Sequence, residues 1–75
     1  METLRQTSDR INRGLSSNGL HALHESIGEA VVIDDAAPPN QEVFGVRIFS
    51  DFRIQSASIE EELRQRGESF DPIRW

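Results

Sequence analysis

The segment EVFGVRIFSDFRIQ, residues 42–55, carries the most regular pattern in the chain and decides the expected fold. Large apolar side chains fall on every second position, and most positions between them are polar. Alternation over this length is typical of a β-strand with one buried face. We therefore expect the following residues to face the core: Phe44, Val46, Ile48, Phe52 and Ile54. The opposite face is expected to carry Arg47, Asp51 and Arg53.

A second strand is expected just before this segment. Residues 29–34, EAVVID, form a short β-branched run that suits a buried strand. Residues 35–40, DAAPPN, contain two consecutive prolines, which cannot lie inside a hydrogen-bonded ladder. The sequence therefore predicts a β-hairpin over residues 29–55, with a long second strand.

The segment 1–28 is expected to be helical. Thr3 and Gln6 have the spacing of a capping box, which marks a helix start. Apolar residues recur at helical spacing on both sides of Asn18-Gly19, and Gly28 suits a helix end. Asn18-Gly19 is compatible with two helices or with one kinked helix, and the pattern does not choose between them.

A short C-terminal helix is expected over residues 56–67, followed by a tail, residues 68–75. Ser58 and Glu61 have capping-box spacing, and Gly67 is a suitable stop. The expected fold class is thus α+β, in a single small domain over residues 1–75. It comprises a helix or helix pair, a hairpin, a helix and an extended tail.

Composition and charge exclude several classes of function. The 75 residues contain no Cys, which excludes disulfides, thiolate metal sites and thiol catalysis. The net charge of −5 gives no general attraction for phosphate backbones, so no sequence-specific nucleic-acid partner is expected. The longest apolar run, residues 30–33, is far too short to cross a bilayer. We expect a location in a virion or a host cytoplasm, neither secreted nor in a membrane.

Three clusters are candidates for chemical sites: His21 and His24 with Glu25, the pair Asp34-Asp35, and the run 60–62. The two His side chains share one helix with a single carboxylate, which leaves a zinc ion short of ligands. Both acidic runs lack metal-binding spacing, and the second is typical of a helix start. We therefore expect no catalytic, cofactor-binding or metal-binding residues and no enzymatic activity.

Apolar side chains in unusual places indicate a protein interface. Phe49 lies on the otherwise polar face of the expected strand, and the tail carries several large side chains. Trp and Arg are favoured at interface centres. The expected interface residues are Phe49, Phe70, Ile73, Arg74 and Trp75. The tail is expected to dock on a neighbouring chain, the alternative being that it folds back onto its own core.

The order of expected elements between residues 12 and 54 resembles a known family. A helix leads into IGEAVVI, residues 27–33, and then, after a loop, into VFGVRIFSD, residues 43–51. This order is similar to the opening of head–tail joining and head-completion proteins of tailed bacteriophages. Residues 64–70 distantly resemble a turn found later in that family. The resemblance implies a structural virion component arranged as a ring at the portal vertex, without enzymatic activity.

The expected function is therefore assembly through protein–protein contact, as a small phage connector or completion component. Its partners would be copies of itself and neighbouring virion proteins. The alternative hypothesis is that the protein is a small inhibitor or regulator that binds one host protein, in the manner of an anti-defence protein or antitoxin. Stoichiometric incorporation into particles would support the first, and a fixed-ratio complex in solution would support the second.

Overall fold

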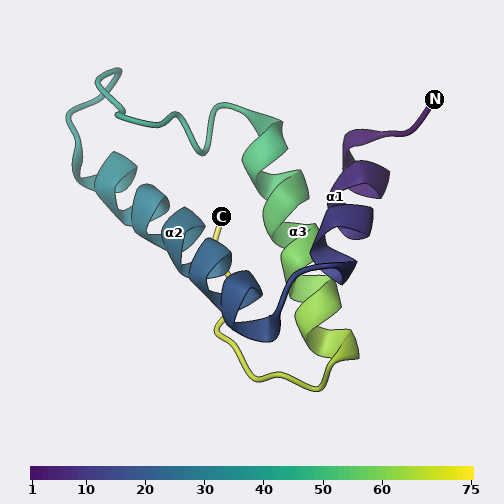
Figure 1. Cartoon of the computed structure of the whole chain (residues 1–75). Coiled ribbons are helices and arrows are strands. Elements are labelled where there is room, and N and C mark those ends of the chain that lie inside the picture. Colours follow the sequence, from purple (N-terminus) through teal and green to yellow (C-terminus); the bar gives the residue numbers. More distant parts are fainter.

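The computed structural model describes all 75 residues and contains three α-helices and no β-strand (Figure 1). Their bounds are Leu4–Arg13 for α1, Ser17–Ala36 for α2 and Ser50–Gln65 for α3. α3 packs against both of the other helices and is the centre of the arrangement. The molecule is flat, with extents of 37 × 32 × 16 Å, so its core is thin.

The predicted α+β fold is wrong, because the first expected strand is the second half of α2. Residues 29–36 continue the helix through Gly28 without a break. The inward positions of α2 follow one another at steps of three or four residues: Leu20, His24, Ile27, Val31 and Asp34. This helical period spans the whole segment and outweighs the β propensity of its β-branched run.

The second expected strand is also absent, because residues 42–49 form a loop and the rest of the segment begins α3. Of the five predicted core residues, only Val46 is fully buried, while Phe44 and Ile48 are 46 % and 66 % exposed. Phe52 and Ile54 are half-buried on a helix. The three residues expected to face solvent are exposed, namely Arg47, Asp51 and Arg53.

The first helix begins as predicted and ends earlier. Thr3 caps α1 in a capping box: its N–H donates to the Gln6 side chain at 2.8 Å, and its hydroxyl accepts from Gln6 N–H at 3.1 Å. The helical structure is interrupted at residues 14–16 rather than at Asn18-Gly19. Ser16 caps α2, since its hydroxyl accepts a hydrogen bond from Gly19 N–H at 3.0 Å. The N-terminal segment is therefore a helix pair.

The third helix starts well before the predicted capping box. It begins at Ser50, preceded by Phe49, whose side chain makes no capping hydrogen bond. Ser58 therefore lies in mid-helix, and the helix start predicted there is wrong. The end is close to the prediction: Gly67 follows the last turn with φ of 72°, a backbone conformation that favours glycine.

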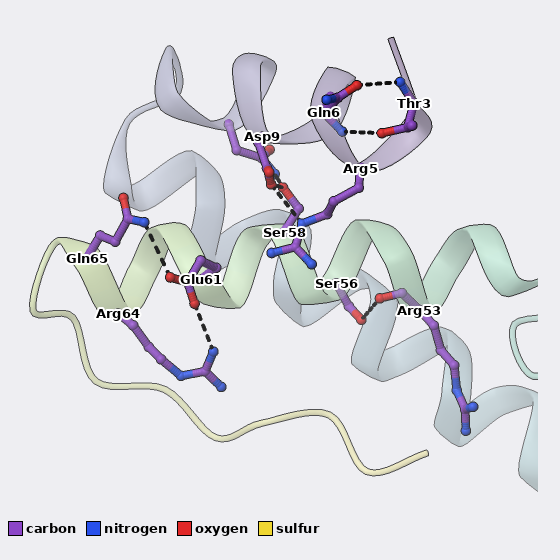
Figure 2. A network of polar contacts seen from close by, with 11 residues as sticks. Thr3, Arg5, Gln6, Asp9, Arg53, Ser56, Ser58, Glu61, Arg64 and Gln65 are labelled. Atoms are coloured by element: carbon purple, nitrogen blue, oxygen red, sulfur yellow. Dashed lines mark hydrogen bonds and ion pairs between the residues drawn. The ribbon is translucent and has the colours of Figure 1, made fainter. Parts of the chain in front are cut away.

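Polar contacts join α1 to α3. The Ser58 hydroxyl donates to Asp9 Oδ1 at 2.6 Å and accepts from the side-chain amide of Asn12 at 2.9 Å. Figure 2 shows Asp9 of α1 and Ser58 of α3 pointing toward one another. The Arg66 guanidinium donates to the backbone carbonyls of Asn12 and Arg13, at the C-terminal end of α1. The Arg13 carbonyl is one that the helix end leaves without a backbone donor, while the Asn12 carbonyl also accepts from the Leu15 N–H at 3.1 Å.

The loop between α2 and α3 folds around one buried carboxylate. Asp34 accepts hydrogen bonds from the N–H groups of Val43, Phe44 and Val46 at 2.9–3.0 Å. Gly45 within this loop has φ of 71°, and a Cβ there would lie 2.8 Å from the Phe49 ring. A residue with a side chain would be strained at this position, so Gly45 is fitted to the turn.

The hydrophobic core is small. Its central cluster is Leu20, Ile59 and Leu63, against which Leu15, Ile27 and Phe70 pack. The buried polar side chains are all hydrogen-bonded. Many large apolar side chains are left at the surface, among them Ile11, Leu23, Val32, Ile33, Phe44, Ile48 and Phe49. No helix has the length and apolar character needed to cross a membrane.

Candidate protein-interaction surface

An apolar cleft of about 330 Å³ opens where the three helices meet. No charged residue lines it, although charged residues make up 28 % of the chain. Its apolar lining consists of Leu4, Ile11, Leu23, Ile27 and Ile59. Its polar lining consists of Thr7, Ser8, Asn12, Ser26 and Gln55. Ile59 belongs to the core, so the cleft reaches down to the core cluster.

A second cleft, of about 370 Å³, continues the first along α2 toward the loop. Ser26 and Ile27 line both clefts and therefore lie at their junction. The rest of the second lining is Glu29, Ala30, Ile33, Phe44 and Phe52, of which only Glu29 is charged. We call the two clefts together the apolar face.

Helical periodicity places these side chains on one face. On α1, the sequence puts Leu4, Ser8 and Ile11 at steps of four and three. On α2, Leu23, Ala30 and Ile33 flank the inward-facing residues on one side. Leu23 is 45 % exposed and Ile11 is 52 % exposed, so both helices carry apolar side chains that the core does not cover.

The other side of α2 is covered by the C-terminal tail. The Phe70 ring meets the His24 ring edge-on, with centroids 5.4 Å apart. His24 Nε2 lies 2.8 Å from the Glu60 carboxylate on α3, and the Ile73 N–H donates to that carboxylate at 3.0 Å. The guanidinium of Arg64 lies over the Phe70 ring at 5.4 Å. The tail is thus bound to both long helices, and in Figure 1 it runs back past α2.

The end of the tail is held by two arginines. The Arg47 guanidinium donates to the Trp75 carbonyl at 2.6 Å and to the Arg74 carbonyl at 3.3 Å. It also forms two hydrogen bonds with Asp35, at 2.8 and 2.9 Å, which lower the pKa of that carboxyl. Arg53 lies 5.4 Å from the centre of the Trp75 ring.

The structure separates the predicted interface residues into two groups. Phe70, Ile73 and Trp75 are half-buried against their own chain, and Phe70 packs on the core cluster. The tail therefore folds back, which was the alternative to docking on a neighbour. Arg74 is exposed, and Phe49 is 59 % exposed beside Gly45. No hydrogen bond or ring contact joins Phe49 to the tail. An interface role for these residues stays a prediction.

The side chains of the three clusters that were not expected to form chemical sites make contacts within the fold. His24 is paired with Glu60, while His21 Nε2 lies 3.9 Å from Glu68. A cleft of about 610 Å³ between α2 and the tail contains both His side chains and Glu25. No group of three or more His, Asp or Glu side chains is placed to hold a metal ion. Asp34 and Asp35 have different partners. Asp34 accepts hydrogen bonds from the loop backbone, and Asp35 pairs with Arg47.

The apolar face itself was not predicted as a site. Leu4, Ile11, Leu23 and Ile27 stood out by their helical spacing, which is the signal of a core-facing stripe. The chain is too thin to cover all of them, so part of the stripe remains open. Comparison of the chain with protein-family models, with curated proteins and with solved structures gave no match.

Proposed function

We propose that this protein is a non-enzymatic component that acts through protein–protein contact, and that the apolar face is its contact surface. The observation that supports this is the open, nearly uncharged cleft system spanning all three helices. Contiguous exposed apolar surface of this kind, rimmed by polar residues, typically marks an interaction site. Covering it would remove apolar area from water, which is the main driving force of association.

Assembly is the form of this function that we favour, because a small core next to an open apolar face suits a chain that works as part of a larger particle. A phage connector or completion component is the specific version suggested by residues 27–33 and 43–51. These residues form helix and loop rather than the two expected strands, so only their sequence motifs support that version.

The alternative is an inhibitor or regulator that binds one host protein. An acidic chain of net charge −5 with an apolar face could bind a target that joins an apolar surface to a basic rim. The two forms differ in where the protein is found. An assembly component co-purifies with particles in a fixed copy number, whereas an inhibitor forms a soluble complex of fixed ratio.

Leu23→Arg provides a direct test, because it places a charge in the apolar face without emptying a core site. The matched control is Val32→Arg, which changes a 68 % exposed residue of the same helix on its tail side. Complexes captured with each variant would be compared by native mass spectrometry. We expect Leu23→Arg to lose its protein partner and Val32→Arg to keep it. Equal retention by both variants would contradict the proposal.

A further inference from the structure

We infer that the surface beneath the tail is a peptide-binding site, and that the chain's own tail, residues 69–75, is its resident occupant. An extended segment of a partner protein, with the tail's pattern of side chains, takes the same place once the tail is displaced. We call this surface the tail site, and it is formed by His24 of α2, Arg47 of the loop, and Arg53, Glu60 and Arg64 of α3. It lies across α2 from the apolar face and therefore goes beyond the proposed function.

The tail is bound in the way that a separate peptide is bound. Residues 68–75 have no regular secondary structure, and residues 69–75 make no hydrogen bond to another backbone group. Side chains hold the backbone instead: Glu60 accepts from the Ile73 N–H at 3.0 Å, and Arg47 donates to the carbonyls of residues 74 and 75. Hydrogen bonds to the backbone, together with pockets for spaced side chains, are a common way for proteins to bind extended peptides.

The two side chains that bind the tail backbone are positioned by partners outside the tail. Glu60 Oε2 lies 2.8 Å from His24 Nε2, and the side chains of His24 and Glu60 are only 8 % and 12 % exposed. The Arg47 guanidinium forms two hydrogen bonds with Asp35 of α2. Since neither Glu60 nor Arg47 depends on the tail for its position, the tail site is preorganised, which lowers the cost of binding a new segment.

The side chains that the tail places against the helices define the segment that the site fits. Phe70 packs on the core cluster, and the Arg64 guanidinium lies 5.4 Å from the centre of its ring. Ile73 is half-buried three residues later, and Trp75, two residues further on, has Arg53 5.4 Å from its ring centre. In Figure 2, Arg53 and Arg64 point to the side of α3 along which the tail runs. Because guanidinium groups bind favourably over aromatic faces, the partner segment carries an aliphatic residue between two aromatic residues at this spacing.

The tail has the features of a segment that can be displaced. Its anchoring side chains are only half-buried, and the residues between them are exposed. A cleft of about 610 Å³ remains open between α2 and the tail, so the tail does not fill the space beside α2. At the start of the tail, a Cβ on Gly67 would meet no atom within 4 Å apart from its chain neighbours. Segments with few buried contacts open at a low cost in free energy.

The covalent link to α3 keeps the tail site closed in the isolated chain. A short link gives a tethered segment an effective concentration on the order of millimolar. A free segment therefore competes poorly with an intact tail. It binds when the tail is weakened, or when its own concentration approaches that of the tethered tail.

The first test weakens the tail within the full chain. The probe is a synthetic peptide of residues 68–75 with a fluorescent label at its N-terminus, and its binding is measured by fluorescence anisotropy. Phe70→Ala removes the aromatic anchor of the tail, so this variant should bind the peptide at least about ten-fold more tightly than the wild type does. Arg74→Ala is the matched control, because its side chain is exposed and only its backbone carbonyl is bound, and it should bind like the wild type. Adding Glu60→Gln to Phe70→Ala should weaken the binding again, since the peptide then loses the carboxylate that accepts from its backbone.

The second test uses the wild-type chain, with Trp75 as the reporter. Trp75 is the only Trp, and the chain has no Tyr. The competing peptide is residues 68–75 carrying Trp75→Phe, which does not emit at tryptophan wavelengths. At millimolar concentration it should displace the tail and shift the Trp75 emission to the red, because the ring then loses its contact with the protein. A peptide of the same composition in scrambled order should leave the emission unchanged.

Equal peptide affinities of Phe70→Ala and the wild type, with helices intact by circular dichroism, would overturn this inference. If Phe70→Ala loses its helices, the Trp75 emission of the wild type decides alone. An emission that ignores the competing peptide, or that responds equally to the scrambled one, would show that the tail is a fixed part of the fold. Leu23→Arg on the apolar face should bind the labelled peptide as the wild type does, so failure at one surface is distinguishable from failure at the other.

Discussion

The buried carboxylate of Asp34 accepts a hydrogen bond from the N–H of Val46, 2.9 Å away and twelve residues further along the chain. Together with the bonds from Val43 and Phe44, this contact closes the loop between α2 and α3 over the end of α2. Val46 is fully buried as a result. One side chain thus orders a loop that has no regular secondary structure.

Asp34→Asn should loosen this loop. An amide offers one oxygen where the carboxylate offers two, and its NH₂ group would face backbone donors. We expect a lower melting temperature and faster proteolytic cleavage within residues 37–49. The control is Asp35→Asn, which changes an exposed neighbour that accepts from a side chain rather than from the loop backbone. Equal cleavage of the wild type and Asp34→Asn would show that the loop is ordered by other contacts.

The same carboxylate should make stability fall in acid. Burial opposes ionisation of Asp34, and the N–H groups of residues 43–46 outweigh it, so the pKa of Asp34 is below its ordinary value of 3.8. Since the folded pKa is lowered, the stabilisation is complete above the ordinary value. It is lost as the pH falls through the folded pKa, because the unfolded chain takes up its proton first.

Urea unfolding between pH 7 and pH 2 measures this effect. The pKa values of Asp9 and Asp35 are also lowered, by hydrogen bonds from Ser58 and Arg47 respectively, so part of the acid sensitivity belongs to them. We expect Asp34→Asn to be less stable at neutral pH and to lose less stability below about pH 4 than the wild type does. Parallel pH profiles for the two proteins would contradict this assignment.

Core burial predicts a contrast between two aliphatic residues. Leu63 is fully buried in the central cluster, and Leu63→Ala should cost about 2–5 kcal/mol of unfolding free energy. Ile48 is 66 % exposed in the loop, and Ile48→Ala should change the unfolding free energy by no more than about 0.5 kcal/mol. Chemical unfolding of both variants tests the contrast. A similar loss in both would favour the β-strand in which Ile48 faces the core.

Some helix ends could be predicted, because caps depend on neighbouring residues, but the ends expected at Gly28 and Ser58 were wrong. Thr3 with Gln6, and Gly67, could be identified from spacing alone. The predicted hairpin is wrong because the alternation over residues 42–55 spans two different elements. Gly45 and the bonds to Asp34 turn its first half into a loop, and its second half begins α3. The position of Asp34 relative to that loop is a tertiary contact that local propensity does not contain.

The apolar face could not be predicted from the sequence for a related reason. A stripe such as Leu23 and Ile27 shows which face of a helix is apolar, but not what covers it. Here the tail packs on one side of α2 through Phe70, and no part of the chain packs over the apolar cleft on the other side. The position of the tail depends on contacts of Glu60 with both His24 and Ile73, which are far apart in the sequence.

The tail is expected to contribute to the stability of its own chain. Phe70 packs on the core cluster, and Ile73 is bound through its backbone to Glu60. Phe70→Ala should therefore lower the urea midpoint. The loss of unfolding free energy should be less than the about 3–5 kcal/mol of a fully buried Phe, because the ring is only half-buried. The Ile73 amide should exchange its hydrogen faster in Glu60→Gln, since the amide group is a poorer acceptor than the carboxylate that holds both partners. Arg74→Ala is the control, because its side chain is exposed and only its backbone carbonyl is bound. A chain truncated after Ser69 that unfolds at the same urea concentration as the full chain would show that the tail adds nothing to the fold and is free to serve as an interface.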